Sequence, residues 1–332
     1  MKLRKTADTD YLYASAHIRA VQSADSMREK VERMLNAADF YEAAAIFCPN
    51  GADDINSGNY QDILDAELIK SYDFVTSMIG NSPIVSIFKY PYDCNNLKLA
   101  FKSELCGAQV DELYYPFATV SVTGLKKAMR ERDFSEYPDT MAQAASQLTE
   151  FISKNPDPQL IDIVIDRACL EDMMKSTVGL GCEYLSDIIK TKMDSYNILS
   201  FIRCVRMKKS GQFYKNLTVS GGNVPTDTLI VAYDSGLDSL AEKLKMTVYS
   251  SVSDSIAKYL CEPMPGFFSS VEKELESIYT SRTDEVKFIS FGPEIPLSYL
   301  IECERDIKNA GIILAGKSAG LDNKTIRGRL RT

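Results

Sequence analysis

Residues 194–203 read DSYNILSFIR, and the same pattern of residue types occurs twice more in the chain. Residues 93–102 read DCNNLKLAFK, and residues 306–315 read DIKNAGIILA. Aligned without gaps, each copy begins with Asp and has Asn three residues later, which gives the pairs Asp93/Asn96, Asp194/Asn197 and Asp306/Asn309. The copies start 101 and 112 residues apart. This near-equal spacing predicts three similar units of about 100–110 residues.

Apolar residues follow each Asn at the same three offsets. They are Leu97, Ala100 and Phe101, then Ile198, Phe201 and Ile202, then Ala310, Ile313 and Leu314. This spacing forms one stripe on a helix that faces the core of a bundle. An Asp and an Asn three residues apart share a helix face and can cap or bridge neighbouring segments. The pairs therefore either pin loops within each unit or line a surface that the three units share.

Helical periodicity dominates the rest of the chain. Helices are predicted for residues 13–46, 140–153, 158–175, 237–261, 267–280 and 297–315, with breaks at 155–158, 221–222, 261–266 and 292–296. The strand candidates 84–88, 119–122 and 229–233 are too short and isolated to build a sheet. We therefore predict an all-α fold of three helical-bundle domains, 1–128, 129–235 and 236–332.

The composition is that of an ordinary soluble protein, with 45% hydrophobic and 25% charged residues. The formal net charge is −8, and the only dense basic run is the tail at 324–331. Binding to nucleic acid is not expected, because it requires clustered Lys and Arg. The chain has neither a signal-peptide pattern nor an apolar run long enough to cross a bilayer, so a cytoplasmic location is predicted.

Metal and redox sites are not predicted either. The eight cysteines contain no C-x-x-C pair and read as small buried residues in a reducing compartment. His17 is the only histidine, which excludes sites with two histidine ligands and argues against a histidine-based triad. No cofactor or metal is expected.

Residues 311–318, GIILAGKS, fit the phosphate-binding pattern G-x-x-x-x-G-K-[ST]. A working phosphate loop needs a strand before it, an open glycine-rich turn, and a helix after it. Here the preceding residues 298–310 have helical periodicity, and the four variable positions are apolar. We therefore predict a helix that ends near Gly316, with Lys317 at its negative dipole end, and a short final helix at 323–330.

Other catalytic patterns are also missing. The sequence has no G-x-S-x-G, H-E-x-x-H or G-x-G-x-x-G motif. The carboxylates of Glu302, Glu304 and Asp306 are expected on a solvated helix face. The sequence therefore predicts a protein without an active site of its own.

Three segments, in this order and spacing, resemble a known family. They are 11–20 (YLYASAHIRA), 194–203 followed by a basic turn and 217–222 (LTVSGG), and 306–317 (DIKNAGIILAGK) with 320–321 (GL). The chain resembles the C subunit of bacterial and archaeal V-type (A/V-type) ATPases, the equivalent of the d subunit of the vacuolar enzyme. The resemblance spans nearly the whole chain, although 169–181 shows no feature that can be aligned to it.

The resemblance implies an all-α funnel of three helical domains around a pseudo-threefold axis. It also implies a non-catalytic central-stalk subunit on the cytoplasmic face of the membrane. Such a protein couples rotation of the central shaft, made of D and F type subunits, to the membrane rotor ring, and it meets the membrane only through that ring. The expected partner contacts are the repeated polar residues Asp93, Asn96, Asp194, Asn197, Asp306 and Asn309, with Arg203 and Arg206 facing acidic loops.

Two other functions compete with this one. A helical-repeat scaffold that binds soluble partners would also lack an active site, but a period of about 100 residues is long for a solenoid. A nucleotide-binding enzyme would rest on GIILAGKS alone. The sequence leaves open whether the rotary machine moves protons or sodium ions, and whether it makes or hydrolyses ATP.

Overall fold

The computed structural model describes residues 8–24, 27–49, 55–56, 58–80, 82–152, 158–178 and 180–331. The regular structure in these ranges is helical and contains no strand, which confirms the all-α prediction. The chain divides into two compact units. The middle unit comprises the described residues within 82–268, and the terminal unit those within 6–81 and 269–332. The three domain boundaries and the funnel stay predictions.

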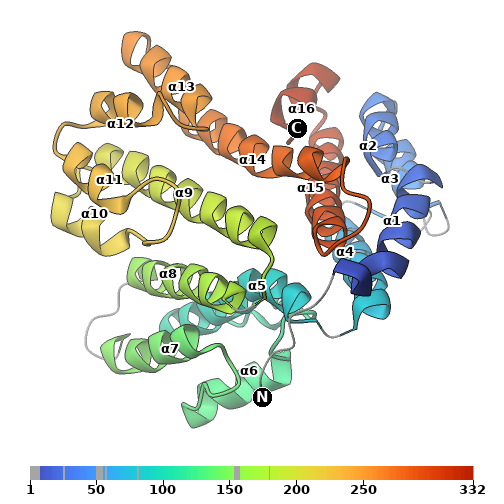
Figure 1. Cartoon of the computed structure of the whole chain (residues 1–332), viewed down its shortest axis with the longest axis horizontal. Coiled ribbons are helices and arrows are strands. Elements are labelled where there is room, and N and C mark those ends of the chain that lie inside the picture. The colour runs from blue at the N-terminus through green and yellow to red at the C-terminus, as the bar shows by residue number, and fades with distance from the viewer. Residues whose placement is uncertain are drawn as a thin grey trace. The chain divides into compact units, whose positions relative to one another are not determined.

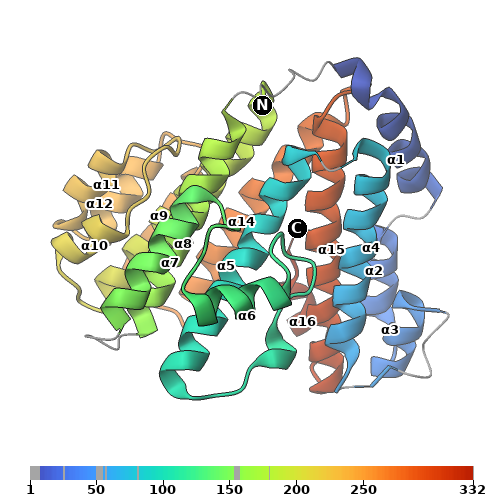
Figure 2. The ribbon, with the colours of Figure 1, turned by 90° about the horizontal axis from the view of Figure 1, so that it is seen from below.

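The middle unit contains nine α-helices within its described residues. They are α5 (Pro83–Cys106), α6 (Val122–Glu131), α7 (Asp139–Ile152), α8 (Pro158–Thr177), α9 (Glu183–Arg206), α10 (Gly211–Leu217), α11 (Thr226–Tyr233), α12 (Leu237–Leu244) and α13 (Ser250–Cys261). Helix α8 packs on α5, α7 and α9, and α9 also packs on α10 and α11 (Figures 1 and 2). Helices α12 and α13 pack on each other, and α12 also packs on α11.

The terminal unit joins segments from both ends of the sequence. Its helices are α1 (Leu12–Ala24), α2 (Met27–Asn36), α3 (Phe40–Phe47), α4 (Tyr60–Ile79), α14 (Phe267–Val286) from Ser269 onward, α15 (Glu294–Ser318) and α16 (Asn323–Arg329). Helix α15 is the central element, since α1, α2, α3, α4 and α16 all pack on it (Figure 1). The unit is therefore a bundle around one long helix.

Each copy of the repeat lies on a long helix, namely α5, α9 and α15. All nine stripe side chains predicted from the repeat are buried, with at most 6% of any of these residues exposed. These residues face the cores of their units, as predicted, because their spacing places them on one side of the helix.

Several predicted elements differ from the observed ones. Residues 84–88 belong to α5, since Pro83 occupies its first turn after the N-cap Ser82, where a missing N–H costs nothing. Residues 229–233 lie in α11, and 119–121 lead into α6, whose first residue is Val122. The predicted helix 13–46 is divided into α1, α2 and α3, and 237–261 into α12 and α13. The predicted break at 155–158 lies outside the described residues except for Pro158.

The end of the chain agrees closely with the prediction. Helix α15 ends at Ser318, with Lys317 in its last turn. Helix α16 begins after the N-cap Asp322, whose carboxylate accepts a hydrogen bond from the N–H of Thr325. A helix therefore occupies the position that a phosphate loop would require to be open.

Candidate functional site

The Asn of each repeat clamps the main chain of a distant loop residue. Its side-chain amide donates to the carbonyl of that residue and accepts from the N–H of the same residue, with N···O distances of 2.7–2.9 Å in all three copies. The pairs are Asn96 with Tyr115, Asn197 with Val219, and Asn309 with Arg331. Each clamp satisfies both polar groups of a main-chain unit that would otherwise be costly to remove from water.

The Asp of the first two repeats holds the next part of the same loop. Asp93 accepts from the N–H of Thr119 at 3.2 Å and of Val120 at 2.9 Å. Asp194 accepts from the N–H of Asn223 at 2.9 Å and of Val224 at 3.0 Å. These N–H groups precede α6 and α11, so each carboxylate fixes the start of a following helix through charge-assisted hydrogen bonds.

Both carboxyl groups are desolvated by the protein. Burial raises the pKa of Asp93 and of Asp194 above the ordinary value, while the hydrogen bonds that they accept act in the opposite direction. Asp194 has one further donor, the hydroxyl of Tyr249 at 2.8 Å. Gly222 comes so close to Asp194 that an added Cβ would lie 2.1 Å from the carboxylate. Asp93 likewise has a third donor, the hydroxyl of Thr119 at 2.5 Å, so both carboxylates are enclosed by donors.

The third repeat has the Asn clamp, but its Asp does not bind the main-chain N–H groups that begin a following helix in the described chain. The carboxylate of Asp306 accepts a hydrogen bond from Nε of Arg305 at 2.8 Å. No main-chain N–H in the described part of the chain reaches it. The three Asp/Asn pairs are thus similar in sequence but differ in what they hold.

All six repeated polar residues lie in the interior of their units. Between 0% and 5% of each residue is exposed. Their hydrogen bonds support the interpretation in which the pairs pin loops within each unit. Direct contact of these six side chains with a partner stays a prediction.

Arg203 and Arg206 lie apart from this interior network. Both are exposed in the last turn of α9, and together with Lys208 and Lys209 they form what we call the basic end of α9. The guanidinium of Arg203 lies 4.7 Å from the ring centroid of Phe268. Their contact with acidic loops of a partner also stays a prediction.

The residues of the GIILAGKS segment have packing roles. An added Cβ at Gly311 would lie 3.1 Å from Leu64 of α4, and one at Gly316 would lie 2.7 Å from Ile326 of α16. Lys317 donates to the main-chain carbonyl of Ala37 and lies 3.3 Å from the side-chain oxygen of Asn323. The glycines permit close approach of helices, and the lysine is held at the end of α15.

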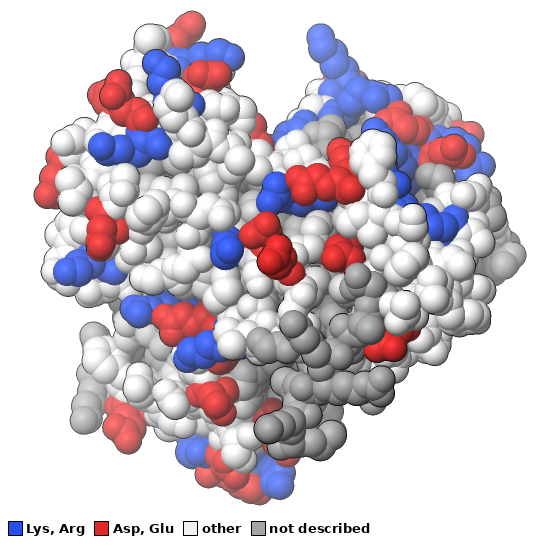
Figure 3. All heavy atoms as spheres, in the orientation of Figure 1, with Lys and Arg blue, Asp and Glu red and all other residues white. Residues whose placement is uncertain are grey.

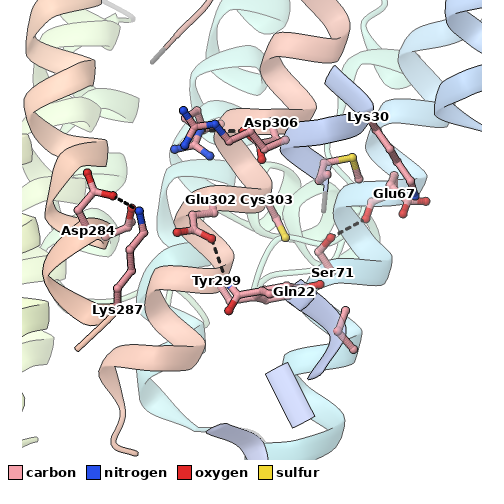
Figure 4. Close-up of a pocket in the computed structure, with 15 residues that line it drawn as sticks. Gln22, Lys30, Glu67, Ser71, Asp284, Lys287, Tyr299, Glu302, Cys303 and Asp306 are labelled. Atoms are coloured by element: carbon pink, nitrogen blue, oxygen red, sulfur yellow. Dashed lines mark hydrogen bonds and ion pairs between the residues drawn. The ribbon is translucent and has the colours of Figure 1, made fainter. Parts of the chain in front are cut away.

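A cavity of about 320 Å³ lies in the terminal unit among α1, α2, α4, α14 and α15 (Figure 4). Opposite charges pair along its wall, as Lys287 does with Asp284 at 2.5 Å and Arg305 with Asp306 at 2.8 Å. The amide of Gln22 donates to Glu302 at 2.9 Å. Charges that pair with one another in this way do not indicate a catalytic acid, base or nucleophile.

The expectation of a solvated face on α15 is wrong. Asp306 is buried, Glu302 is half-buried, and Glu304 accepts a hydrogen bond from the hydroxyl of Tyr72 at 2.5 Å. The reason is that helices from both ends of the sequence surround α15. Burial raises the pKa of Glu302, and it raises the pKa of the Cys303 thiol to about 12.

The part of the chain that the structure describes contains neither a candidate metal site nor a candidate membrane-spanning helix. Across these ranges, no group of three or more His, Cys, Asp or Glu side chains could hold a metal ion. None of the helices described has the length and apolar character needed to span a membrane. Acidic and basic side chains are interspersed over the face shown in Figure 3. The Asn clamp is the arrangement of polar groups that all three copies of the repeat share in the described chain.

Sequence reasoning identified the Asp and Asn of this network but missed most of their partners. The clamped residues Tyr115, Val219 and Arg331 share no side-chain type, because each clamp uses main-chain atoms. Only the nearly constant separation of 19 or 22 residues from each Asn could have indicated them.

One family model and several known proteins match this chain over most of its length. The model of the ATP synthase (C/AC39) subunit family matches residues 14–329. The C subunit of the V-type sodium ATPase of Enterococcus hirae is 25% identical over 268 residues, which cover 81% of this chain and 80% of the relative. The C subunit of the A-type ATP synthase of Methanococcoides burtonii is 23% identical over an alignment that covers 98% of this chain and 95% of the relative.

Proposed function

Since the chain belongs to the ATP synthase (C/AC39) subunit family, we propose that it is the central-stalk subunit of a V-type or A-type rotary enzyme. In this role it receives the end of the central shaft, formed by D and F type subunits, and sits on the membrane rotor ring. Its location is peripheral, on the cytoplasmic face of the membrane. It passes rotation between shaft and ring, while ATP is turned over on other subunits and ions cross through the ring.

The family match over residues 14–329 is the observation that carries this proposal. The threefold repeat supports it, because a part that grips a rotating shaft profits from equivalent elements placed around it. The clamps support it as well. A loop whose main-chain N–H and carbonyl are both held by a buried side chain resists displacement, and a coupling element must transmit torque without deforming.

The clamps also indicate how the repeated polar residues serve the proposed interface. Their side chains are buried, so a partner that docks on the chain meets the loops that they hold. We assign Asp93, Asn96, Asp194 and Asn197 to the support of such loops. The exposed guanidinium groups of Arg203 and Arg206 are the candidates for direct contact with acidic segments.

A crosslinking pull-down from native membranes tests the proposal. The full chain carries an affinity tag, the membranes are crosslinked and solubilised, and the captured proteins are identified by mass spectrometry. We expect subunits of the shaft and of the ring in amounts comparable to the bait. Capture of soluble proteins alone, with neither shaft nor ring subunits, would favour a helical-repeat scaffold and overturn the proposal.

A further inference from the structure

Two buried cysteines meet where α5 packs on α8 in the middle unit. Cys94 lies on α5 and Cys169 lies on α8, and only 4% of each residue is exposed. Their thiols are within hydrogen-bonding distance of each other, and both are free. The two residues are 75 positions apart in the sequence, so the fold brings them together without any C-x-x-C spacing.

An aspartate on α8 holds this contact in place. The thiol of Cys94 donates to Asp166, with 3.2 Å between Sγ and Oδ1. The same carboxylate forms an ion pair with Lys98 of α5 at 2.6 Å. Because Asp166 and Cys169 are three residues apart on α8, they share the helix face that meets α5. The two sulfur atoms are therefore kept side by side by polar contacts between the helices.

A small cavity reaches this contact from the surface. It has a volume of about 130 Å³, and Asp166 lines it together with Tyr196, Ser200 and Cys204 of α9. The side chain of Asp166 is 31% exposed, so solvent meets the carboxylate that binds the Cys94 thiol. A small polar oxidant that enters the cavity therefore comes within one side chain of the two thiols.

The surroundings of Cys94 keep its proton in place. The neighbouring Cys169 thiol, burial and the negative charge of Asp166 all raise the pKa of Cys94 well above its ordinary value. Cys94 is therefore a thiol at neutral pH, with a carboxylate in position to receive its proton. This arrangement suits a resolving cysteine, which attacks a sulfur atom that has already been oxidised.

We propose that Cys94 and Cys169 form a reversible disulfide when the chain meets a hydroperoxide. The sulfur of Cys169 attacks one oxygen of hydrogen peroxide, the O–O bond breaks, and a sulfenic acid and water form. The sulfur of Cys94 then attacks the Cys169 sulfur, and the S–O bond breaks. The proton of Cys94 passes through Asp166 to the departing hydroxide, which leaves as a second water. A small thiol reduces the disulfide by exchange and restores both cysteines.

The disulfide fastens the helix that carries the first repeat. Asp93, directly before Cys94 on α5, holds the N–H groups of Thr119 and Val120. A covalent bond from α5 to α8 restricts the unfolded chain more than the folded one, so it stabilises the unit that contains this loop. The disulfide forms whether or not the chain is a rotary subunit, since every group involved lies within the chain itself.

The test uses the full chain with the exposed Cys106 and Cys261 replaced by serine, which prevents disulfides between molecules at these positions. The folded protein is treated with hydrogen peroxide at neutral pH, blocked with N-ethylmaleimide, and digested without reduction. We expect mass spectrometry to find the Cys94 and Cys169 peptides joined, and dithiothreitol to separate them. We expect the Tm of the oxidised protein to be several degrees above that of the reduced protein.

Three variants in the same background assign the sulfur atoms. Cys94→Ser keeps a donor to Asp166, and we expect dimedone to trap the sulfenic acid of Cys169 in this variant. In Cys169→Ser we expect roughly tenfold less adduct, at Cys94, because that cysteine stays protonated. Cys204→Ser is the control, since it removes another buried thiol that lines the same cavity, and it should still form the disulfide.

Two results would overturn the proposal. One is the absence of joined Cys94 and Cys169 peptides after peroxide treatment of the folded protein, and the other is an equal Tm for its oxidised and reduced forms. Both compare a single protein in two states, so they decide the question even if a variant fails to fold. Equal dimedone adducts in Cys94→Ser and Cys169→Ser would overturn the order of the two steps.

Discussion

At the scale of single residues, Asp194 is a carboxylate with no exposed surface and three hydrogen-bond donors. A buried carboxylate is tolerated only when donors replace the water that it has lost. Two of these donors are main-chain N–H groups, and the third is the hydroxyl of Tyr249. Burial and the nearby charge of Asp194 raise the pKa of Tyr249, so its hydroxyl remains a donor at neutral pH.

The change Tyr249→Phe removes that third donor without altering the shape of the ring. Because the acceptor is charged and buried, we expect the free energy of unfolding to fall by about 1–3 kcal/mol. Urea denaturation of the isolated chain measures it. The control is Tyr259→Phe, whose ring stacks on Phe267 with the ring centroids 4.0 Å apart. For this variant we expect the free energy of unfolding to change by no more than about 0.5 kcal/mol. Equal losses in the two variants would contradict this role for Tyr249.

Cysteine reactivity provides a second test at this scale. Burial raises the pKa of Cys303 to about 12, whereas Cys106 and Cys261 are exposed. Since the thiolate is the nucleophile, we expect an alkylating reagent at pH 8 to modify Cys106 and Cys261 within minutes and to spare Cys303 until the chain unfolds. Peptide mass spectrometry over time follows each site. Modification of Cys303 in the native chain at the rate of Cys106 would contradict the observed burial.

At the scale of elements, the contact between α15 and α16 depends on a glycine in a helix. Gly316 lies beneath Ile326, which is fully buried, so the two helices approach more closely than a side chain would allow. Glycine weakens a helix by roughly 0.5–1 kcal/mol relative to alanine, and the close contact offsets that cost. The match to a phosphate-binding pattern therefore arises from helix packing.

The change Gly316→Ala tests this explanation. The added methyl group would force Ile326 and α16 to shift, and we expect a loss of about 1–3 kcal/mol in the free energy of unfolding. Gly328, in α16, has open space around its Cβ position, so Gly328→Ala should leave stability unchanged or raise it by up to about 1 kcal/mol. Denaturation curves of both variants give the comparison. Stabilisation by both substitutions would show that the contact at Gly316 is not tight.

At the scale of the whole molecule, the proposed coupling role requires exposed groups that meet a partner. The basic end of α9 offers the exposed side chains of Arg203, Arg206 and Lys208 in a chain whose net charge is −8. Opposite charges across an interface steer association and fix its register. This end is therefore the clearest candidate for an electrostatic contact.

Reversing these charges provides the test. We expect the double variant Arg203→Glu/Arg206→Glu to capture roughly tenfold less of the shaft subunits from native membranes, because repulsion would replace attraction. The control Lys243→Glu/Lys245→Glu makes the same change in net charge at exposed positions of α12 and just beyond it. Thermal unfolding checks that both proteins fold. Equal capture by the two variants would remove the basic end of α9 from the interface.

Residue spacing alone predicts the helical class, the three recurring Asp/Asn positions, and the apolar stripe that follows each of them. These features are local, because helix periodicity and residue spacing act over a few turns of one segment. The glycines and lysine of GIILAGKS could also be assigned to a helix end from their flanking residues. The strand candidate at 84–88 was wrong, since Pro83 directly before it is the first residue of a helix.

The contacts of these positions follow from the folded chain and not from residue spacing. Asn96, Asn197 and Asn309 bind main-chain atoms 19 or 22 residues away. Because the main-chain atoms are the same in nearly all residue types, the type of the bound residue does not reveal the contact. The carboxylates on α15 were expected in solvent, but helices from both ends of the sequence pack around them. Burial is a property of the assembled bundle, so neither the enclosure of Asp194 nor the open cavity beside Asp306 could be read from the order of the residues.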